Sequence, residues 1–143
     1  MRQIKEIIVH CSATAEGKDF DVNDIERWHK ANGWSGCGYH YVIKLDGTIE
    51  FGRSISKQGA HCSGHNANSI GICYIGGCAA DGKTPKDTRT DKQKEALEWL
   101  LVVLRATFPM AKVIGHNEVA KKACPSFRLC DDYRIRKIIG RSM

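Results

Sequence analysis

The chain has 143 residues, of which 42% are hydrophobic and 27% are charged, and it carries a formal net charge of +6 at pH 7. This size and composition are typical of one folded domain with a buried core, so we expect residues 1–143 to form a single domain. No apolar run reaches the roughly 18 residues that a membrane helix needs, so we expect a soluble protein without membrane insertion.

The basic charge and the cysteines limit the partners and the redox environment. A positive net charge favours polyanionic partners, which include nucleic acids and anionic cell walls. Basic residues are scattered except at residues 134–137, which fit a solvated helix face better than a nucleic-acid patch. The seven cysteines are odd in number and irregularly spaced. They therefore favour free thiols made in a reducing cytosol over a complete disulfide framework.

The first half of the chain predicts a strand, a helix and a hairpin. Residues 5–10 are apolar and β-branched, which predicts a buried strand that ends at His10 and is followed by a polar loop. Asp21 can cap a helix over residues 22–32. The predicted hairpin consists of residues 39–45, whose odd-numbered side chains share one face, an Asp-Gly turn and residues 48–51.

The second half continues the alternation of strands and helices. A loop rich in Gly, His and Asn at residues 59–68 precedes a predicted buried strand at residues 69–75. The polar segment 76–89 predicts a mobile surface loop, and a capping-box pattern predicts a helix over residues 90–108. The last predicted elements are a short strand at residues 113–114 and a helix at residues 132–139. This order predicts an α/β fold, with a mixed central sheet flanked by helices.

Three potential metal ligands, His10, His116 and Cys124, lie just after predicted strands or in tight loops. His10 is distant in sequence from the other two, so only a folded sheet could gather them. Catalytic zinc sites are commonly built in this way, with three protein ligands and a fourth tetrahedral position for water. Taken singly, each residue has an ordinary explanation, as a hydrogen-bonded strand end, a solvated loop residue or a small buried hydrophobic residue.

The segments around these residues resemble one family over nearly the whole chain, the zinc-dependent N-acetylmuramoyl-L-alanine amidases of phage-lysozyme and peptidoglycan-recognition-protein type. Residues 7–14 resemble the family's first strand with a zinc histidine, and residues 38–43 its hairpin with an active-site tyrosine. Residues 59–72 are similar to the substrate-groove loop and next strand, particularly in phage members such as T7 lysozyme. Residues 115–118 and 122–127 resemble the segments that supply the second histidine, a catalytic lysine and the cysteine ligand.

The resemblance implies the T7-lysozyme and recognition-protein amidase fold, with Zn²⁺ held by His10, His116 and Cys124. It implies hydrolysis of the amide bond between N-acetylmuramic acid and L-alanine in peptidoglycan. Zinc can lower the pKa of a water from 15.7 to about 7, so Cys124 would be a ligand and not a nucleophile. The resemblance also implies that Lys122 stabilises the oxyanion and that Tyr39 orients the water or donates a hydrogen bond to the intermediate.

The loop at residues 59–68 offers further candidates for contact with the substrate. His61 could touch the substrate or assist proton transfer to the leaving amine. His65, Asn66 and Asn68 could orient the glycan or the stem peptide, although turn formation explains asparagines in such a loop equally well.

Two cysteines and one tyrosine have competing interpretations. Cys11 and Cys62 each directly follow a candidate histidine, so either could act as an alternative thiolate ligand or be oxidised. Successive strand residues point to opposite faces, which argues against Cys11 and His10 binding one metal. Without the resemblance, Tyr39 would be interpreted as an aromatic residue packed in the sheet with its hydroxyl at the edge.

Two other functions are compatible with the sequence. One is a non-catalytic peptidoglycan-binding module, but such relatives lack the cysteine ligand, and the presence of Cys124 favours catalysis. The other is a basic nucleic-acid-binding or polymerase-binding protein, a partner class that the scattered charge makes less expected. The first nine residues lack the features of a secretory signal. We therefore expect a monomeric phage or prophage endolysin that accumulates in the cytoplasm and reaches the cell wall after release.

Overall fold

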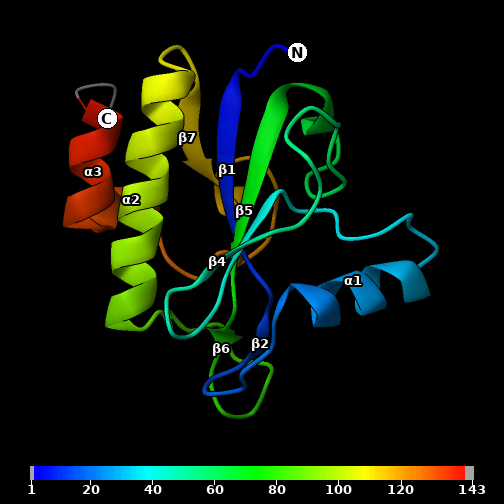
Figure 1. The fold of residues 1–143 in the computed structure, drawn as a ribbon. Coiled ribbons are helices and arrows are strands. Elements are labelled where there is room, and N and C mark those ends of the chain that lie inside the picture. Colours follow the sequence, from blue (N-terminus) through cyan, green and yellow to red (C-terminus); the bar gives the residue numbers. More distant parts are fainter. Residues whose placement is uncertain (1, 141–143) are drawn as a thin grey trace.

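The computed structural model describes residues 2–140, which form a mixed β-sheet with helices on both faces (Figure 1). Within this range the main sheet has the strand order β4-β3-β5-β1-β7. The strands are β1 (Glu6–Cys11), β3 (Tyr41–Ile43), β4 (Ile49–Phe51), β5 (Ser69–Tyr74) and β7 (Lys112–Gly115). Strand β4 is antiparallel to β3, and the other neighbouring pairs are parallel. The predicted fold class, α/β with a mixed central sheet flanked by helices, is confirmed.

Helices α2 (Asp91–Thr107) and α3 (Tyr133–Ile139) cover one face of the sheet, and α1 (Val22–Ala31) lies on the other side (Figure 1). The α2 face holds the larger core cluster, in which apolar residues of β1, β5 and β7 pack against four leucines. Those leucines are Leu97, Leu100, Leu101 and Leu104. A smaller cluster packs Ile25 of α1 near Val42 and Cys73. Strands β1 and β5 are therefore covered on both faces, which explains their nearly continuous apolar sequences.

Helix α2 begins with the predicted capping box, and one of its residues also binds the sheet. The Thr90 hydroxyl accepts a hydrogen bond from Gln93 N at 3.0 Å, and Gln93 Oε1 accepts one from Thr90 N at 3.0 Å. The fully buried Gln93 also donates from Nε2 to the carbonyls of Ile43 and Ile75, at 3.2 and 2.9 Å. Gln93 thus caps the helix and satisfies carbonyls where β3 and β5 end.

The predicted strand at residues 39–45 is shorter in the structure, where only Tyr41–Ile43 is extended. Tyr41 and Ile43 pack in the α2 cluster, whereas Tyr39 and Leu45 pack in the α1 cluster. The prediction that these odd-numbered residues share one face is therefore wrong. Pairing with β5 covers only Tyr41–Ile43, so the alternation of a strand does not extend to the flanking residues.

The segment at residues 76–89 is a surface loop only in its middle, where residues 80–87 are exposed as predicted, whereas its two ends are buried. It contains β6 (Gly77–Cys78), which pairs in parallel with β2 (Thr14–Ala15) inside the predicted polar loop after His10. Arg89 is 9% exposed and donates to the carboxylates of Asp87 and Asp132, at 2.9 and 2.8 Å. The polar side chains of Thr88 and Arg89 are therefore buried and hydrogen-bonded, a distinction that polar composition alone does not reveal.

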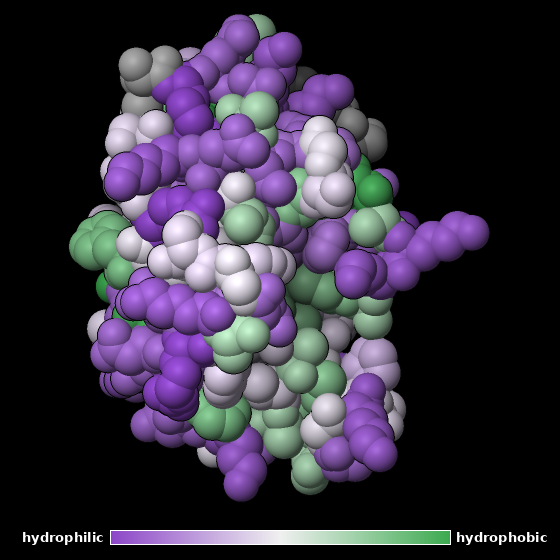
Figure 2. All heavy atoms as spheres, turned by 90° about the vertical axis from the view of Figure 1, so that its right-hand side faces the viewer, coloured by the Kyte–Doolittle hydropathy of each residue, from purple (hydrophilic) through white to green (hydrophobic). Residues whose placement is uncertain are grey.

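Hydrophilic residues predominate on the side of the molecule that carries α1, with smaller hydrophobic areas between them (Figure 2). No helix within residues 2–140 has the length and apolar character required to cross a membrane. The basic residues of α3 are exposed, which confirms the predicted solvated helix face. The 3₁₀ helices are η1 (Asn66–Asn68), η2 (His116–Glu118) and η3 (Leu129–Asp131).

Replacement of the capping residues should lower stability by different amounts. Thr90→Ala should cost about 1 kcal/mol, because it removes one helix cap. Gln93→Ala should cost more, roughly 2–4 kcal/mol, because it also removes two buried hydrogen bonds to the carbonyls of Ile43 and Ile75, the first of which keeps its bond from the Ile75 N–H. Urea unfolding measures both values, and Glu95→Ala on the exposed side of α2 is the control. Equal costs for the two variants would contradict the role of Gln93 in the sheet.

Candidate metal centre

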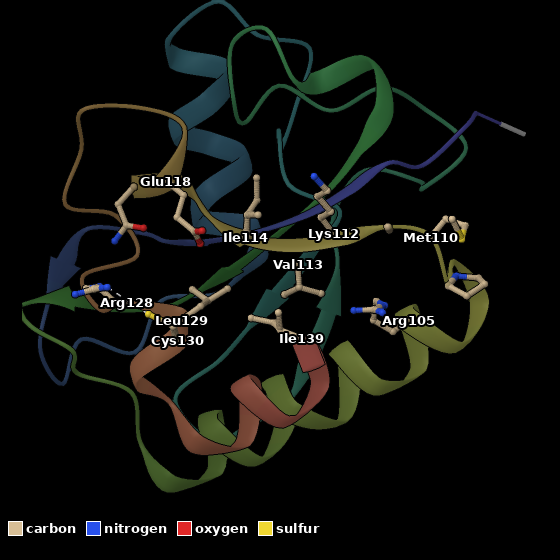
Figure 3. A pocket seen from close by; sticks show the side chains of 13 residues that line it. Arg105, Met110, Lys112, Val113, Ile114, Glu118, Arg128, Leu129, Cys130 and Ile139 are labelled. Atoms are coloured by element: carbon tan, nitrogen blue, oxygen red, sulfur yellow. Dashed lines mark hydrogen bonds between the residues drawn. The ribbon is translucent and has the colours of Figure 1, made fainter. Parts of the chain in front are cut away.

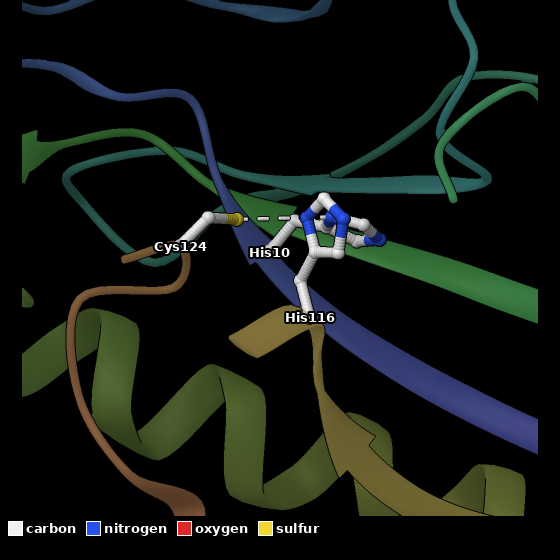
Figure 4. Close-up of side chains that lie close together, drawn as sticks. All are labelled: His10, His116 and Cys124. Carbon is white, nitrogen blue, oxygen red and sulfur yellow. Dashed lines mark hydrogen bonds between the residues drawn. The ribbon is translucent and has the colours of Figure 1, made fainter. Parts of the chain in front are cut away.

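The structure brings His10, His116 and Cys124 together at the carboxyl ends of two parallel strands (Figure 4). His10 lies in β1, His116 directly follows β7, and Cys124 lies in the loop beyond η2. One donor atom of each residue lies within 4.8 Å of the donors of the other two. His10 Nδ1 is 3.7 Å from Cys124 Sγ.

The donor set fits a tetrahedral metal ion. Zn–N and Zn–S bonds of about 2.0–2.1 and 2.3 Å place the two donor atoms about 3.6 Å apart in a tetrahedral site. His10 Nδ1 and Cys124 Sγ show nearly this separation. His116 Nδ1 is buried and has no hydrogen-bond partner among the described residues, which is costly for a polar atom unless another group binds it. Imidazole nitrogens and a sulfur together favour zinc over the hard cations Mg²⁺ and Ca²⁺.

Two more aromatic side chains lie against His10. His61 Nδ1 is 2.8 Å from His10 Nε2, and the ring centroids of Tyr39 and His10 are 5.1 Å apart. Tyr39 also lies 5.5 Å, centroid to centroid, from the ring of His29 on α1. The segment before β3 and the loop at residues 59–68 therefore meet at the candidate ligand His10, and α1 contacts this group through Tyr39.

The predicted substrate residues of the loop have different surroundings. Asn66 Oδ1 accepts hydrogen bonds from the backbone N–H groups of His61 and Cys62, both at 2.9 Å. Asn68 Nδ2 donates to the carbonyl of Gln3 at 2.9 Å. Asn66 therefore stabilises the turn of the loop, whereas Asn68 ties the loop to the start of the chain.

His65 lies beside a small cavity. Its Nδ1 is 2.8 Å from Glu6 Oε1, and the two residues line a cavity of about 350 Å³ together with Lys5 and Lys112. His65, which was predicted to bind substrate, therefore lines a cavity.

Cys11 is excluded from the ligand group by the alternation of β1. Its side chain is buried in the α2 cluster, on the opposite face from His10, which confirms the expectation from strand geometry. Its backbone N–H donates to Cys124 Sγ at 3.2 Å, and its thiol also forms a side-chain hydrogen bond with Cys124. All seven cysteines are free thiols, as predicted.

Sequence reasoning did not single out Arg2, which fixes the loop that carries His61. The Arg2 guanidinium donates to the carbonyl oxygens of four residues and lies 3.3 Å from His40 Nε2. The acceptors are Ile55, Asn66, Ala67 and Ser69. One arginine near the chain start carries no motif, so only the folded loop reveals this function.

A larger cavity, of about 720 Å³, lies beside the edge strand β7 and α3 (Figure 3). Arg105, Met110 and Ile139 are among its lining residues, and none of the three candidate ligands lines it. The chemistry of the donors, and not the size of a cavity, therefore identifies the functional site.

Comparison with known proteins identifies the family. The family model described as N-acetylmuramoyl-L-alanine amidase matches residues 1–127. The chain belongs to this amidase family. The resemblance inferred from the sequence, the enzyme class and the fold are thereby confirmed.

The relatives of this amidase include phage proteins of similar length. The endolysin of Escherichia phage T7 is 47% identical over 123 residues, which are 86% of this chain and 81% of the relative. The endolysin of Enterobacteria phage K11 is 44% identical over 128 residues, 90% and 84% of the two chains. The solved structure of the amidase LysC from Clostridium intestinale URNW has a TM-score of 0.80 at 26% identity. That match covers 96% of this chain and 86% of LysC.

Burial keeps the imidazoles of the amidase site neutral. Burial, and then the nearby His61 and His116, hold the pKa of His10 well below 6.5. Burial also lowers the pKa of His116, and the positive charge of Lys122 adds to this effect. Neutral imidazole is the form that binds metals, so neither histidine has to lose a proton first.

The groups around the histidines have shifted pKa values as well. The side-chain hydrogen bond with the Cys11 thiol, followed by burial, raises the pKa of the Cys124 thiol, whereas the Cys11 backbone N–H acts in the opposite direction. Metal binding there would therefore release a proton. Burial lowers the pKa of His61 to about 3. Burial raises the pKa of Tyr39 well above 10, so its phenol is protonated at neutral pH and can donate a hydrogen bond.

Acid should destabilise the amidase through its buried histidines. The pKa values of His10 and His61 are lower in the folded chain than the 6.5 of an unfolded one, so unfolding takes up protons below pH 6.5. The free energy of unfolding should fall between pH 6.5 and 5, by up to ~1.4 kcal/mol per pH unit for each histidine. Urea unfolding at several pH values measures this slope, which should be shallower in His61→Asn. A flat profile over this range would contradict the neutral buried pair.

Proposed function

We propose that this amidase is a zinc-dependent phage or prophage endolysin that cuts between N-acetylmuramic acid and L-alanine in peptidoglycan. The grouping of His10, His116 and Cys124 within 4.8 Å carries the proposal. The family match and the relatives named endolysin, which this chain spans almost fully, support the reaction and the biological setting.

The three ligand residues would contribute two neutral imidazoles and one thiolate to the ion. Zinc bound there supplies a Lewis acid and, by lowering the pKa of water to about 7, a hydroxide at neutral pH. His10 and His116 bind without carrying charge, and Cys124 contributes one negative charge as a thiolate. The N–H of Cys11 donates to that sulfur and stabilises the thiolate. The site therefore keeps a net positive charge, which favours attack on a carbonyl group.

We assign Lys122 and Tyr39 to the substrate carbonyl. Lys122 is exposed, and its positive charge acts on the neighbouring His116. Its ammonium group stabilises negative charge that develops on the carbonyl oxygen as the amide is attacked. The protonated phenol of Tyr39 beside His10 donates a hydrogen bond to the same oxygen or orients the attacking water. His65 and Asn68 line a cavity beside the loop and are the predicted substrate contacts with access to it.

The proposal includes the organisation of the whole chain. Residues 1–143 act as one catalytic domain and as a monomer. Peptidoglycan is the partner, and neither nucleic acid nor insertion into a membrane has a role. The protein is made in the cytoplasm of the producing cell and acts on the cell wall after release.

The reaction is tested by incubating the purified protein with peptidoglycan, with and without a chelator, and identifying the new ends by mass spectrometry. We expect free L-alanine amino groups and muramic acid without its peptide, and loss of both products when the metal is removed. Zinc should restore activity. New reducing sugar ends would contradict the amidase reaction, and full activity in chelator would contradict its dependence on metal.

The role of Lys122 is tested with its neighbour as the control. Lys122→Ala should lower kcat by about 10²–10³, because one group that stabilises the oxyanion is lost. The zinc content should not change. Lys121→Ala removes an equally exposed positive charge from the adjacent position and should leave turnover unchanged. Equal effects of the two substitutions would show that only the overall charge matters.

A further inference from the structure

We propose that His61 is a positioning residue for the metal site, which fixes the tautomer and the orientation of the ligand His10. The inference rests on the proposed function, because it takes His10 Nδ1 as the atom that binds the ion. It differs from the predicted role of His61 in contacting substrate or passing a proton to the leaving amine.

The contacts of His10 assign one function to each of its ring nitrogens. Nδ1 faces Cys124 Sγ at 3.7 Å, and Nε2 faces His61 Nδ1 at 2.8 Å. A neutral imidazole carries a single N–H. With Nδ1 bound to the ion, the proton must lie on Nε2, which donates to His61. His61 Nδ1 is therefore an unprotonated acceptor.

The same argument continues from His61 to the next residue. Because His61 Nδ1 accepts, its own proton lies on Nε2, which is 3.2 Å from Ser69 Oγ. Ser69 is fully buried at the start of β5 and accepts this bond. The three residues form one chain of hydrogen bonds in a single direction, from His10 through His61 to Ser69.

Two glycines form a narrow slot that holds the His61 ring. A Cβ atom at Gly71 would lie 2.6 Å from His61 Cγ and Cδ2, and one at Gly59 would lie 2.7 Å from Cδ2. These distances are too short for any side chain at either position. The His61 backbone N–H is fixed separately by Asn66 Oδ1 at 2.9 Å. The ring therefore packs closely against the backbone at Gly59 and Gly71, which restricts its movement away from His10.

A neutral imidazole in this position has a consequence for the site's charge. Outer partners of metal-bound histidines are often carboxylates, which add negative charge as well as orientation. His61 orients His10 without adding charge, so the ion keeps the net positive charge that the ligand set leaves it. Loss of such an outer partner typically costs 10–100-fold in metal affinity.

The experiment compares His61→Leu, which removes the acceptor at similar size, with His61→Asn, whose Oδ1 can accept near the position of Nδ1. Zinc affinity is measured by competition with a chelator, and the absorption bands of the Co²⁺-substituted protein report the ligand geometry. His65→Leu in the same loop is the matched control, because His65 does not contact His10. Thermal melting and circular dichroism show whether each variant folds.

We expect His61→Leu to bind zinc about 10–100-fold more weakly and to alter the Co²⁺ bands. His61→Asn should recover most of the affinity, and His65→Leu should bind zinc as tightly as the wild-type protein and leave the Co²⁺ bands unchanged. A lowered melting temperature in His61→Leu with unchanged zinc affinity would overturn the inference, and so would equal losses in the Leu and Asn variants. If His61→Leu does not fold, Ser69→Ala provides the test. It keeps the imidazole, removes its acceptor and should weaken zinc binding to a lesser extent, and unchanged binding would overturn the inference.

The inference and the proposed function fail in different ways. A wild-type protein that binds no zinc would remove both. A wild-type protein that binds zinc and cuts peptidoglycan, with variants that bind equally tightly, would remove only the role of His61.

Discussion

The parallel pairing of β1 with β7 is the constraint on which the site depends. In this register Val9 of β1 lies opposite Gly115 of β7. The residues that follow them, His10 and His116, therefore lie at the same edge of the sheet. The third ligand reaches this edge because the loop around Cys124 is tied to the core. The Tyr74 hydroxyl donates to the carbonyl of Pro125 at 2.6 Å.

Burial couples the packing of the protein to its chemistry. His10 is only 1% exposed, and an isolated buried imidazole would lose its hydrogen bonds to water. Here one ring nitrogen of His10 faces the other two candidate ligands, and the other ring nitrogen faces His61. Both nitrogens therefore have a partner. The loop that supplies His61 is in turn held by Arg2 near the start of the chain. The geometry of the ligand group therefore depends on residues outside it.

Much of this arrangement could be predicted from the sequence, because local patterns determine it. The apolar run ending at His10, the capping box of α2 and the family motifs around His116 and Cys124 each specify their own segment. Contacts between distant polar residues could not be predicted in this way. The sequence around His61 does not show which side of its loop faces His10. The polar sequence around Arg89 does not show that the Arg89 side chain is buried. In both cases the side chain is held by a partner that is distant in the sequence, His10 for His61 and Asp132 for Arg89.

Zinc-edge X-ray absorption on the purified amidase, together with its metal content, tests the ligand set most directly. We predict one zinc per chain, with two nitrogen ligands at about 2.0–2.1 Å and one sulfur at about 2.3 Å. The sulfur contribution should disappear in Cys124→Ser. A wild-type spectrum without sulfur, or a sulfur signal that persists in Cys124→Ser, would contradict the assignment of His10, His116 and Cys124 as the metal ligands.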